Sequence, residues 1–335
     1  MAGTDMPLEE LLGHLEILAN DALGLWEMPG GARARLINVS ENATYMVEAE
    51  GGYKAVLRVH RENYHTRRAI ECELEWIRAL AADGVVTTPG YYLGKDRRPI
   101  QEARAAGLAD LRFLVLFHFV EGAAPDESGD LTHGFEELGA IAARMHDHVR
   151  NWRKPANFER LVWDDETVFG PEATWGNWRD APNVTDDMRA ELEKLEATVR
   201  QRLNAYGKGP ERYDLIHADM RLANLLVDGH ATRLIDFDDC GHGWFMYDFA
   251  AAISFIETSP AIPDLKAAWV KGYRSVRDLS AEDEAEIDTL VMLRRMALLA
   301  WIGSHIEAPE PQEMAPHFAA GTMSLAKAYL AKFGN

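Results

Sequence analysis

The chain has 335 residues, 47% of them hydrophobic, and a formal net charge of −19, which together indicate a globular protein large enough for two packed units. The acidic excess argues against a nucleic-acid-binding surface, because such a surface needs clustered Lys and Arg, and only two cysteines, Cys72 and Cys240, leave no disulfide framework or multi-cysteine metal site. With no signal-peptide pattern at the start and no apolar run of about 18 residues, we expect no membrane association and a cytoplasmic location.

The first third of the sequence predicts a small antiparallel sheet flanked by helices. A helix is expected over residues 7–25, and residues 35–61 alternate apolar and polar side chains around a Gly-Gly turn. Residues 66–84 carry apolar side chains at helical spacing and end in glycine. A short strand is then expected at residues 89–94, and a buried strand at residues 111–120.

From residue 131 onward, helical patterns dominate, which predicts a larger, mainly helical second lobe. We therefore expect an α+β fold of two lobes, with an N-terminal lobe over residues 1–117, a hinge at 118–122 and a C-terminal lobe over 123–335. An irregular insert at residues 151–182 interrupts the helices. Four tryptophans occur in it, and we expect core packing from them more than ligand stacking: Trp152, Trp163, Trp175 and Trp178.

The most informative segment reads YDLIHADMRLANLLVDGHATRLIDFDD. Asp219 and Asn224 are separated as the base and the metal-binding asparagine are in the catalytic loop of kinases. A short strand, an Asp-Gly turn and a second strand then lead to Asp236, so a hairpin brings the three side chains to one end. Phosphoryl transfer needs a carboxylate near the attacking hydroxyl and oxygen ligands for Mg2+, and this hairpin offers both.

The motifs HADMRLAN, IDFDD and YDFA resemble those of the aminoglycoside phosphotransferase, choline kinase and homoserine kinase-like superfamily, which has a protein-kinase-like fold. The resemblance implies ATP and Mg2+ as cofactors. It implies that Asp219 orients or deprotonates the acceptor hydroxyl and that His217 braces the loop. Asn224 and Asp236 would bind Mg2+, and Asp238 a second metal ion. The position of Asp248 in YDFA resembles a buried aspartate that supports the catalytic loop.

The same resemblance implies a nucleotide site in the first lobe. Arg58, in AVLRVHR, stands where such kinases place the basic residue that grips the α and β phosphates, and Glu73 would be its ion-pair partner. The backbone of residues 117–120 would meet adenine, and the segment NVSENATY would cover the phosphates. The remaining nucleotide-site residues implied in this way are Phe117, His118, Val120, Ser40 and Asn42.

The sequence departs from the family pattern at the catalytic loop. The family commonly has His-Gly-Asp, followed by His-Pro-Gly before the asparagine. Here Ala218 takes the place of the glycine, and Arg221, Leu222 and Ala223 take the later places. Arg221 is two residues after Asp219, where protein kinases carry a lysine that faces the transferred phosphate, so a catalytic role in stabilising charge is expected for it. No glycine-rich loop is present.

The leading functional hypothesis is transfer of the γ-phosphoryl group of ATP to a hydroxyl of a small, amine-bearing molecule. An amino alcohol, a hydroxy amino acid or an aminoglycoside-like compound fits the acidic chain. Two alternatives are a protein Ser/Thr kinase of the bacterial stress-response type and a non-catalytic nucleotide-binding module. Four acidic residues are candidates for reading the amine: Asp164, Asp165, Glu257 and Glu307.

Overall fold

The computed structural model describes residues 6–39, 41–108, 110–125, 130–228 and 231–334. The chain forms two compact units. Unit 1 comprises Met1–Ala79, Thr88–Glu121 and Pro155–Glu159, and unit 2 comprises Leu80–Thr87, Gly122–Lys154 and Arg160–Asn335.

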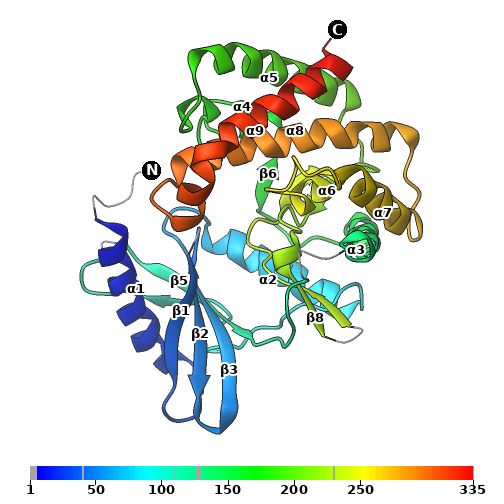
Figure 1. Cartoon of the computed structure of the whole chain (residues 1–335). Coiled ribbons are helices and arrows are strands. Elements are labelled where there is room, and N and C mark those ends of the chain that lie inside the picture. The colour runs from blue at the N-terminus through cyan, green and yellow to red at the C-terminus, as the bar shows by residue number, and fades with distance from the viewer. Residues whose placement is uncertain (1–5, 40, 109, 126–129, 229–230, 335) are drawn as a thin grey trace. The chain divides into compact units, whose positions relative to one another are not determined.

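Unit 1 is built on an antiparallel sheet with the strand order β1-β2-β3-β5-β4. Helix α1 packs its apolar face against the sheet, where Leu15 and Leu18 join Tyr45 and Leu57 in one core (Figure 1). The elements in this unit are α1 (Leu8–Ala22), η1 (Leu23–Leu25), β1 (Arg33–Val39), β2 (Ala43–Ala49), η2 (Glu50–Gly52), β3 (Tyr53–Val59), β4 (Gln101–Ala103) and β5 (Arg112–His118). Helix α2, Arg67–Ala82, begins here and ends within unit 2.

The strand predicted at residues 89–94 is wrong. Tyr91 forms only an isolated bridge with Phe117, and the edge strand beside β5 is β4. The segment still lies along β5, because Tyr92 N–H donates to Leu116 O at 2.7 Å and His118 N–H donates to Gly90 O at 2.8 Å. Pro89 lacks a backbone donor, and such a residue limits ladder formation.

Unit 2 is mainly helical, and Figure 1 shows α8 and α9 running side by side with α5 along α9. Helix α3 packs closely against α7. The helices of this unit are α3 (Thr132–Asn151), α4 (Asp165–Phe169), η3 (Trp178–Asp180), α5 (Asp186–Tyr206), η4 (Leu222–Asn224), α6 (Tyr247–Ala252), α7 (Ile262–Arg274), α8 (Ala281–Ser304) and α9 (Pro309–Phe333). The expected α+β class, an antiparallel sheet followed by a mainly helical region, is confirmed.

Two small sheets position the polar loop of unit 2. Strands β8 (Leu225–Asp228) and β9 (Ala231–Leu234) form the predicted hairpin, whose turn residue Gly229 lies outside the described residues. A second sheet, which the sequence did not indicate, has the order β6-β10-β7. Its strands are β6 (Leu161–Trp163), β10 (Gly241–Trp244) and β7 (Tyr213–Ile216), with β10 parallel to β6 and antiparallel to β7. The insert is thereby joined to the strands on both sides of the hairpin.

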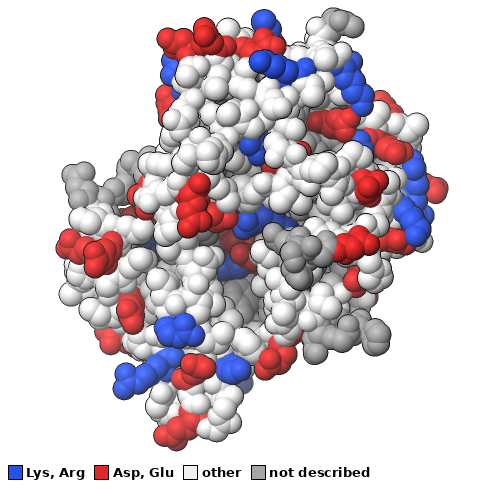
Figure 2. All heavy atoms as spheres, in the orientation of Figure 1, with Lys and Arg blue, Asp and Glu red and all other residues white. Residues whose placement is uncertain are grey.

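Within the described part of the chain, no helix is both long and apolar enough to cross a membrane. On the face shown in Figure 2, acidic and basic side chains are interspersed.

Candidate active site

The candidate catalytic loop begins with a residue in a left-handed backbone conformation. Strand β7 ends at Ile216, and Ala218 has φ +64°. For a residue with a Cβ atom this conformation costs about 1–2 kcal/mol, which is why glycine suits the position better. Two hydrogen bonds oppose that cost, because Asp248 Oδ1 accepts from Ala218 N–H at 2.8 Å and Asp248 Oδ2 accepts from His217 N–H at 3.3 Å. Asp248 is fully buried and supports the loop, as expected from its motif.

Asp219 is the centre of a buried polar cluster. Arg294 Nη2 donates to Asp219 Oδ1 at 2.9 Å, and Asn224 Nδ2 donates to Asp219 Oδ2 at 2.8 Å. Arg221 Nε lies 3.3 Å from Asp219 Oδ1. A carboxylate offers about four lone-pair sites, so three donors leave room for one further hydrogen bond. An acceptor hydroxyl can take that place.

The cations around Asp219 keep its carboxyl group ionised. Burial alone raises the pKa of Asp219, but Arg221, Arg294 and the Asn224 amide together hold that pKa below its ordinary value. In return, Asp219 raises the pKa of Arg221. At neutral pH the carboxylate is therefore suited to orienting a hydroxyl and accepting its proton late in the reaction, when the oxygen has become acidic.

His217 and Asn224 connect the loop to the hairpin. His217 Nε2 donates to Ile235 O at 3.2 Å, and its Nδ1 accepts from Asp219 N–H at 3.3 Å. These bonds require the tautomer with the proton on Nε2. Ile235 N–H donates to Asn224 O at 2.9 Å, so Asp236 follows directly on from a residue tied to Asn224. The structure thus brings His217, Asp219, Asn224 and Asp236 together at one end of the hairpin.

The donor set beside Asp219 suits a hard cation. Asn224 uses its amide nitrogen on Asp219, so its side-chain oxygen remains as a ligand, and the exposed Asp236 has φ +62°. Both offer oxygen atoms, which Mg2+ and Ca2+ prefer. Among the described residues no three His, Cys, Asp or Glu side chains form a metal-binding group on their own. Mg2+ is commonly held by one or two carboxylates together with substrate phosphates and water, and the residues present fit that pattern.

The loop after Asp236 is held by the insert. Arg160 donates to the backbone carbonyls of Asp238 and, at 2.8 Å, of Cys240, and Trp163 Nε1 donates to Asp239 O at 2.7 Å. Asp238, the predicted ligand of a second metal ion, is buried. Trp163 is fully buried and stacks with Tyr247. The insert therefore fixes the backbone beside the candidate metal ligands.

In unit 1, the predicted ion pair between Arg58 and Glu73 is present. Arg58 Nη1 lies 2.7 Å from Glu73 Oε1, and both side chains are buried. Arg58 is on β3 opposite Val115 of β5, and its guanidinium lies over the Phe117 ring at 5.0 Å. The second carboxylate oxygen of Glu73 has no hydrogen-bond partner in the described structure. The pairing with Glu73 therefore holds the Arg58 guanidinium in a fixed position on the sheet.

The other residues predicted for the nucleotide site also lie in unit 1. Ser40 is outside the described residues, and Asn42 is buried with its Oδ1 accepting from Arg61 N–H at 3.1 Å. Phe117 and His118 are on β5, and Val120 follows it. His118 N–H donates to Gly90 O, so this amide is not open to adenine and any contribution from His118 has to come from other atoms.

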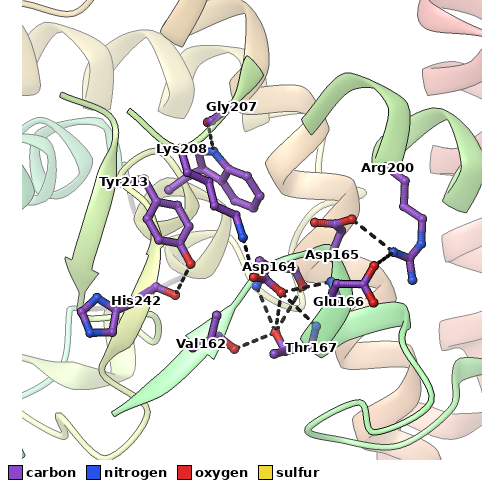
Figure 3. A network of polar contacts seen from close by, with 11 residues as sticks. Val162, Asp164, Asp165, Glu166, Thr167, Arg200, Gly207, Lys208, Tyr213 and His242 are labelled. Carbon is purple, nitrogen blue, oxygen red and sulfur yellow. Dashed lines mark hydrogen bonds and ion pairs between the residues drawn. The ribbon is translucent and has the colours of Figure 1, made fainter. Parts of the chain in front are cut away.

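The acidic residues proposed to read an amine are engaged elsewhere in unit 2. Figure 3 shows Asp164 accepting from the first amides of α4 and pairing with Lys208 at 2.6 Å, while Asp165 pairs with Arg200 at 3.1 Å. Glu257 forms a buried pair with Arg295 at 2.7 Å. Glu307 is exposed. Asp164, Asp165 and Glu257 therefore each have a cationic partner within unit 2, and a role for any of the four residues in binding an amine stays a prediction.

Sequence reasoning missed Arg294, which contacts Asp219 directly. Its guanidinium also lies over the Trp175 ring at 5.1 Å, and its Nε donates to Ser254 at 3.1 Å. The available signal was the pair Arg294-Arg295 inside the apolar helix segment LVMLRRMALLAW, since buried arginines need partners. Glu310, which lies 3.4 Å from Arg221, was missed as well and carries no comparable signal.

Comparison with known proteins gives consistent matches. The Phosphotransferase enzyme family (APH) matches residues 34–284. A solved structure of the microcompartment-associated aminopropanol kinase is 44% identical, with a TM-score of 0.87 over 94% of this chain and 98% of the other. Amicoumacin kinase of Bacillus subtilis (strain 168) is 27% identical over 239 residues, covering 68% of this chain and 67% of the relative.

A further solved structure shares the fold at low identity. It is amicoumacin kinase hAmiN in complex with AMP-PNP, Ca2+ and Ami, at 20% identity and a TM-score of 0.76 over 95% of this chain and 96% of the other. The family match spans most of the chain and includes the loop, the hairpin and Asp248. The chain therefore belongs to the Phosphotransferase enzyme family and is an enzyme, not a non-catalytic nucleotide-binding module.

Proposed function

We propose that this enzyme transfers the γ-phosphoryl group of ATP to the hydroxyl of a small amine-bearing molecule, with a short amino alcohol as the preferred acceptor. The observation that carries the reaction type is the Asp219 cluster, in which a buried carboxylate is held ionised with one hydrogen-bonding site to spare. Similarity to an aminopropanol kinase along nearly the whole chain supports the acceptor class. The net charge of −19 favours a cationic acceptor over an anionic one.

In this proposal, Asp219 positions the acceptor hydroxyl. Arg294 and Asn224 each hold one oxygen of the carboxylate, which fixes its plane. Fixing a reacting group in one orientation is worth several powers of ten in rate, because the reaction no longer waits for alignment. Asp219 then takes the hydroxyl proton as the acceptor oxygen bonds to the γ-phosphorus, while the bond from that phosphorus to the bridging oxygen breaks and ADP leaves.

Arg221 supplies positive charge beside Asp219. It interacts with both Asp219 and Asp236 and is partly exposed, with 27% of its side chain accessible. Charge on the transferred phosphoryl oxygens grows in the transition state, and a fixed guanidinium nearby stabilises it. We therefore assign Arg221 to transition-state stabilisation, as the sequence predicted.

ATP and a divalent cation fit the residues present. Asn224 and Asp236 would hold the cation, which we expect to be Mg2+, and Asp238 would contact a second one. Arg58, paired with Glu73, would contact phosphates of the nucleotide. When bound, the cation neutralises phosphate oxygens and so favours attack by the hydroxyl. A relative that carries AMP-PNP and Ca2+ in its solved structure supports this assignment.

The test is release of ADP from Mg-ATP by the purified protein against a panel of acceptors. The panel contains 1-amino-2-propanol, ethanolamine, choline, homoserine, an aminoglycoside and a generic protein substrate. We expect stimulation by amino alcohols that is lost in Asp219→Asn. Each amino alcohol is matched by the diol in which a hydroxyl replaces the amine, and equal stimulation by the diol contradicts amine recognition.

Other acceptors in the panel define what would overturn the proposal. Stimulation by the protein substrate alone, again lost in Asp219→Asn, indicates a protein kinase. Stimulation by homoserine alone moves the acceptor to hydroxy amino acids and keeps the reaction type. ADP release that Asp219→Asn leaves unchanged contradicts the assigned site.

A further inference from the structure

A series of hydrogen bonds, buried from Tyr273 inward, leads from Arg277, three residues after α7, to Asp248 beneath the candidate catalytic loop. Arg277 Nη1 donates to the Tyr273 hydroxyl at 2.7 Å, and that hydroxyl lies 3.0 Å from His146 Nδ1. His146 Nε2 lies 2.9 Å from Asp248 Oδ2. Asp248 in turn accepts from the backbone of His217 and Ala218. Tyr273, His146 and Asp248 are all fully buried.

We propose that Tyr273 and Arg277 are positioning residues for the reaction, which hold Ala218 in its left-handed conformation, and hence Asp219 in place, through His146 and Asp248. The inference rests on the proposed kinase activity for its kinetic test. It assigns a role to two residues that touch neither the loop nor the candidate metal ligands.

The chemistry of each group decides which partner donates and which accepts in this series of hydrogen bonds. A carboxylate only accepts, so His146 Nε2 must donate to Asp248. Burial lowers the pKa of His146, more than its hydrogen bond to Asp248 raises it, so the ring is neutral and Nδ1 accepts. Burial also raises the pKa of Tyr273, so its O–H is intact and donates to Nδ1. The oxygen of this hydroxyl in turn accepts the hydrogen bond from Arg277 Nη1.

Each member of the chain is held by further packing. Phe245 stacks on the His146 ring with centroids 4.4 Å apart, and the Arg277 guanidinium lies over the Phe245 ring at 4.8 Å. Arg277 Nε pairs with Asp147 at 3.2 Å. These contacts stop the His146 ring from rotating, because rotation would break the stack as well as two hydrogen bonds.

Two glycines allow α7 to come close enough to α3 for this contact. A Cβ atom on Gly139 would stand 2.0 Å from Trp269 O, and one on Gly272 would stand 1.8 Å from Glu136 O. Gly272 precedes Tyr273, and Gly139 lies two turns before His146 on α3. The two helices therefore cross so closely that only glycine fits at these two positions. This close crossing sets the distance between the Tyr273 hydroxyl and His146.

The strain at Ala218 explains why such support is needed. Without a fixed Asp248, the loop gains stability by leaving the left-handed region, and Asp219 would move with it. A glycine at this position removes most of that gain, because glycine adopts positive φ without cost. Dependence on Tyr273 should therefore vary with the residue at position 218.

The experiment is a double-mutant cycle between Tyr273→Phe and Ala218→Gly in the full-length enzyme. We expect Tyr273→Phe to lower kcat about tenfold, because it leaves His146 Nδ1 buried without a donor, with little change in KM for ATP. In the Ala218→Gly background the same substitution should lower kcat by less than about threefold. Tyr206→Phe is the matched control, since its side chain lines the same small pocket as Tyr273 and Arg277, but its hydroxyl donates to Asp283 at 2.6 Å and not to His146.

Hydrogen exchange at the amides of His217 and Ala218 provides a readout that does not depend on turnover. We expect these amides to exchange faster in Tyr273→Phe and at the wild-type rate in Tyr206→Phe. An equal loss of kcat in both backgrounds, or unchanged exchange at both amides, overturns the proposal and leaves Tyr273 a core residue. If the wild-type enzyme phosphorylates nothing, the proposed function fails, and the exchange measurement still decides the positioning role.

Discussion

Two buried aspartates of unit 2, Asp219 and Asp164, show how similar electrostatics can serve different purposes. Burial raises the pKa of each, and neighbouring donors and cations more than compensate, so both pKa values are lowered. The donors to Asp164 are local, because they are the amides of Glu166 and Thr167 in the helix that Asp164 caps, with Lys208 added. The donors to Asp219 include Arg294, which is 75 residues away.

The difference lies in what the hydrogen bonds achieve. At Asp164 they satisfy the free N–H groups of a helix start, which any capped helix needs. At Asp219 they fix a carboxylate that caps nothing and follows a strained residue. A buried aspartate with a low pKa is therefore no sign of catalysis by itself. The distinguishing feature of Asp219 is that its carboxylate is held ionised by side chains, and these hydrogen bonds do not cap a helix.

The largest expected effect separates these two aspartates directly. Asp219→Asn should lower kcat about 10²- to 10⁴-fold, because the amide cannot take the hydroxyl proton. Asp164→Asn should leave kcat within about twofold, since it alters only a cap and a surface pair. The measurement is steady-state kinetics with the best acceptor and Mg-ATP. A large loss of kcat in Asp164→Asn with its fold intact would contradict the structural role of Asp164.

The next effect concerns the cation paired with Asp219. Arg294→Met should lower kcat by about tenfold to a hundredfold through misplacement of Asp219, and Arg294→Lys should recover part of that loss. Removing the cation raises the pKa of Asp219, so the acidic limb of the kcat profile should move to higher pH in Arg294→Met. Arg200→Met, in the network of Figure 3, is the control and should keep the wild-type profile. An unshifted limb in Arg294→Met would show that Arg294 does not set the ionisation of Asp219.

The pH dependence of Tm tests the structural role of Asp164. The pKa of Asp164 is lowered from 3.8, so its ionised form stabilises the fold above that value, and this contribution is lost as pH falls through the lowered pKa. Asp164→Asn should lower Tm at pH 7 by an amount equivalent to about 1 kcal/mol for the weakened cap and ion pair. The difference from wild type should shrink below pH 4. A difference that grows with acidity would contradict the assigned direction.

The smallest expected effect is at the outer edge of the Asp219 cluster. Glu310 pairs with Arg221 at 3.4 Å, and 44% of its side chain is exposed. Exposed pairs contribute about 0–1 kcal/mol, so Glu310→Gln should change kcat by less than about threefold and leave Tm unchanged. A kcat loss as large as that of Arg294→Met would show that Glu310 takes part in binding the acceptor.

The fold class and the loop could be predicted because their signals are local. The strands of unit 1 alternate apolar and polar residues, and the spacing of His217, Asp219, Asn224 and Asp236 falls within one loop and hairpin. The Arg58 and Glu73 pair followed from the family resemblance. By contrast, the sheet that joins β6 to β10 escaped prediction, because it pairs short strands from distant segments.

The sequence by itself determined which side chains can carry phosphoryl transfer, since a short loop and a hairpin necessarily bring Asp219, Asn224 and Asp236 to one end. Only the tertiary structure decided how those side chains are held. Arg294 and Asp248 reach the loop from helices whose packing depends on the whole core, and Tyr273 contacts His146, which in turn contacts Asp248. It also decided that Asp164 and Asp165 are paired with cations. Contacts between segments far apart in the chain leave no periodicity or spacing to read, because packing and not chain connectivity creates them.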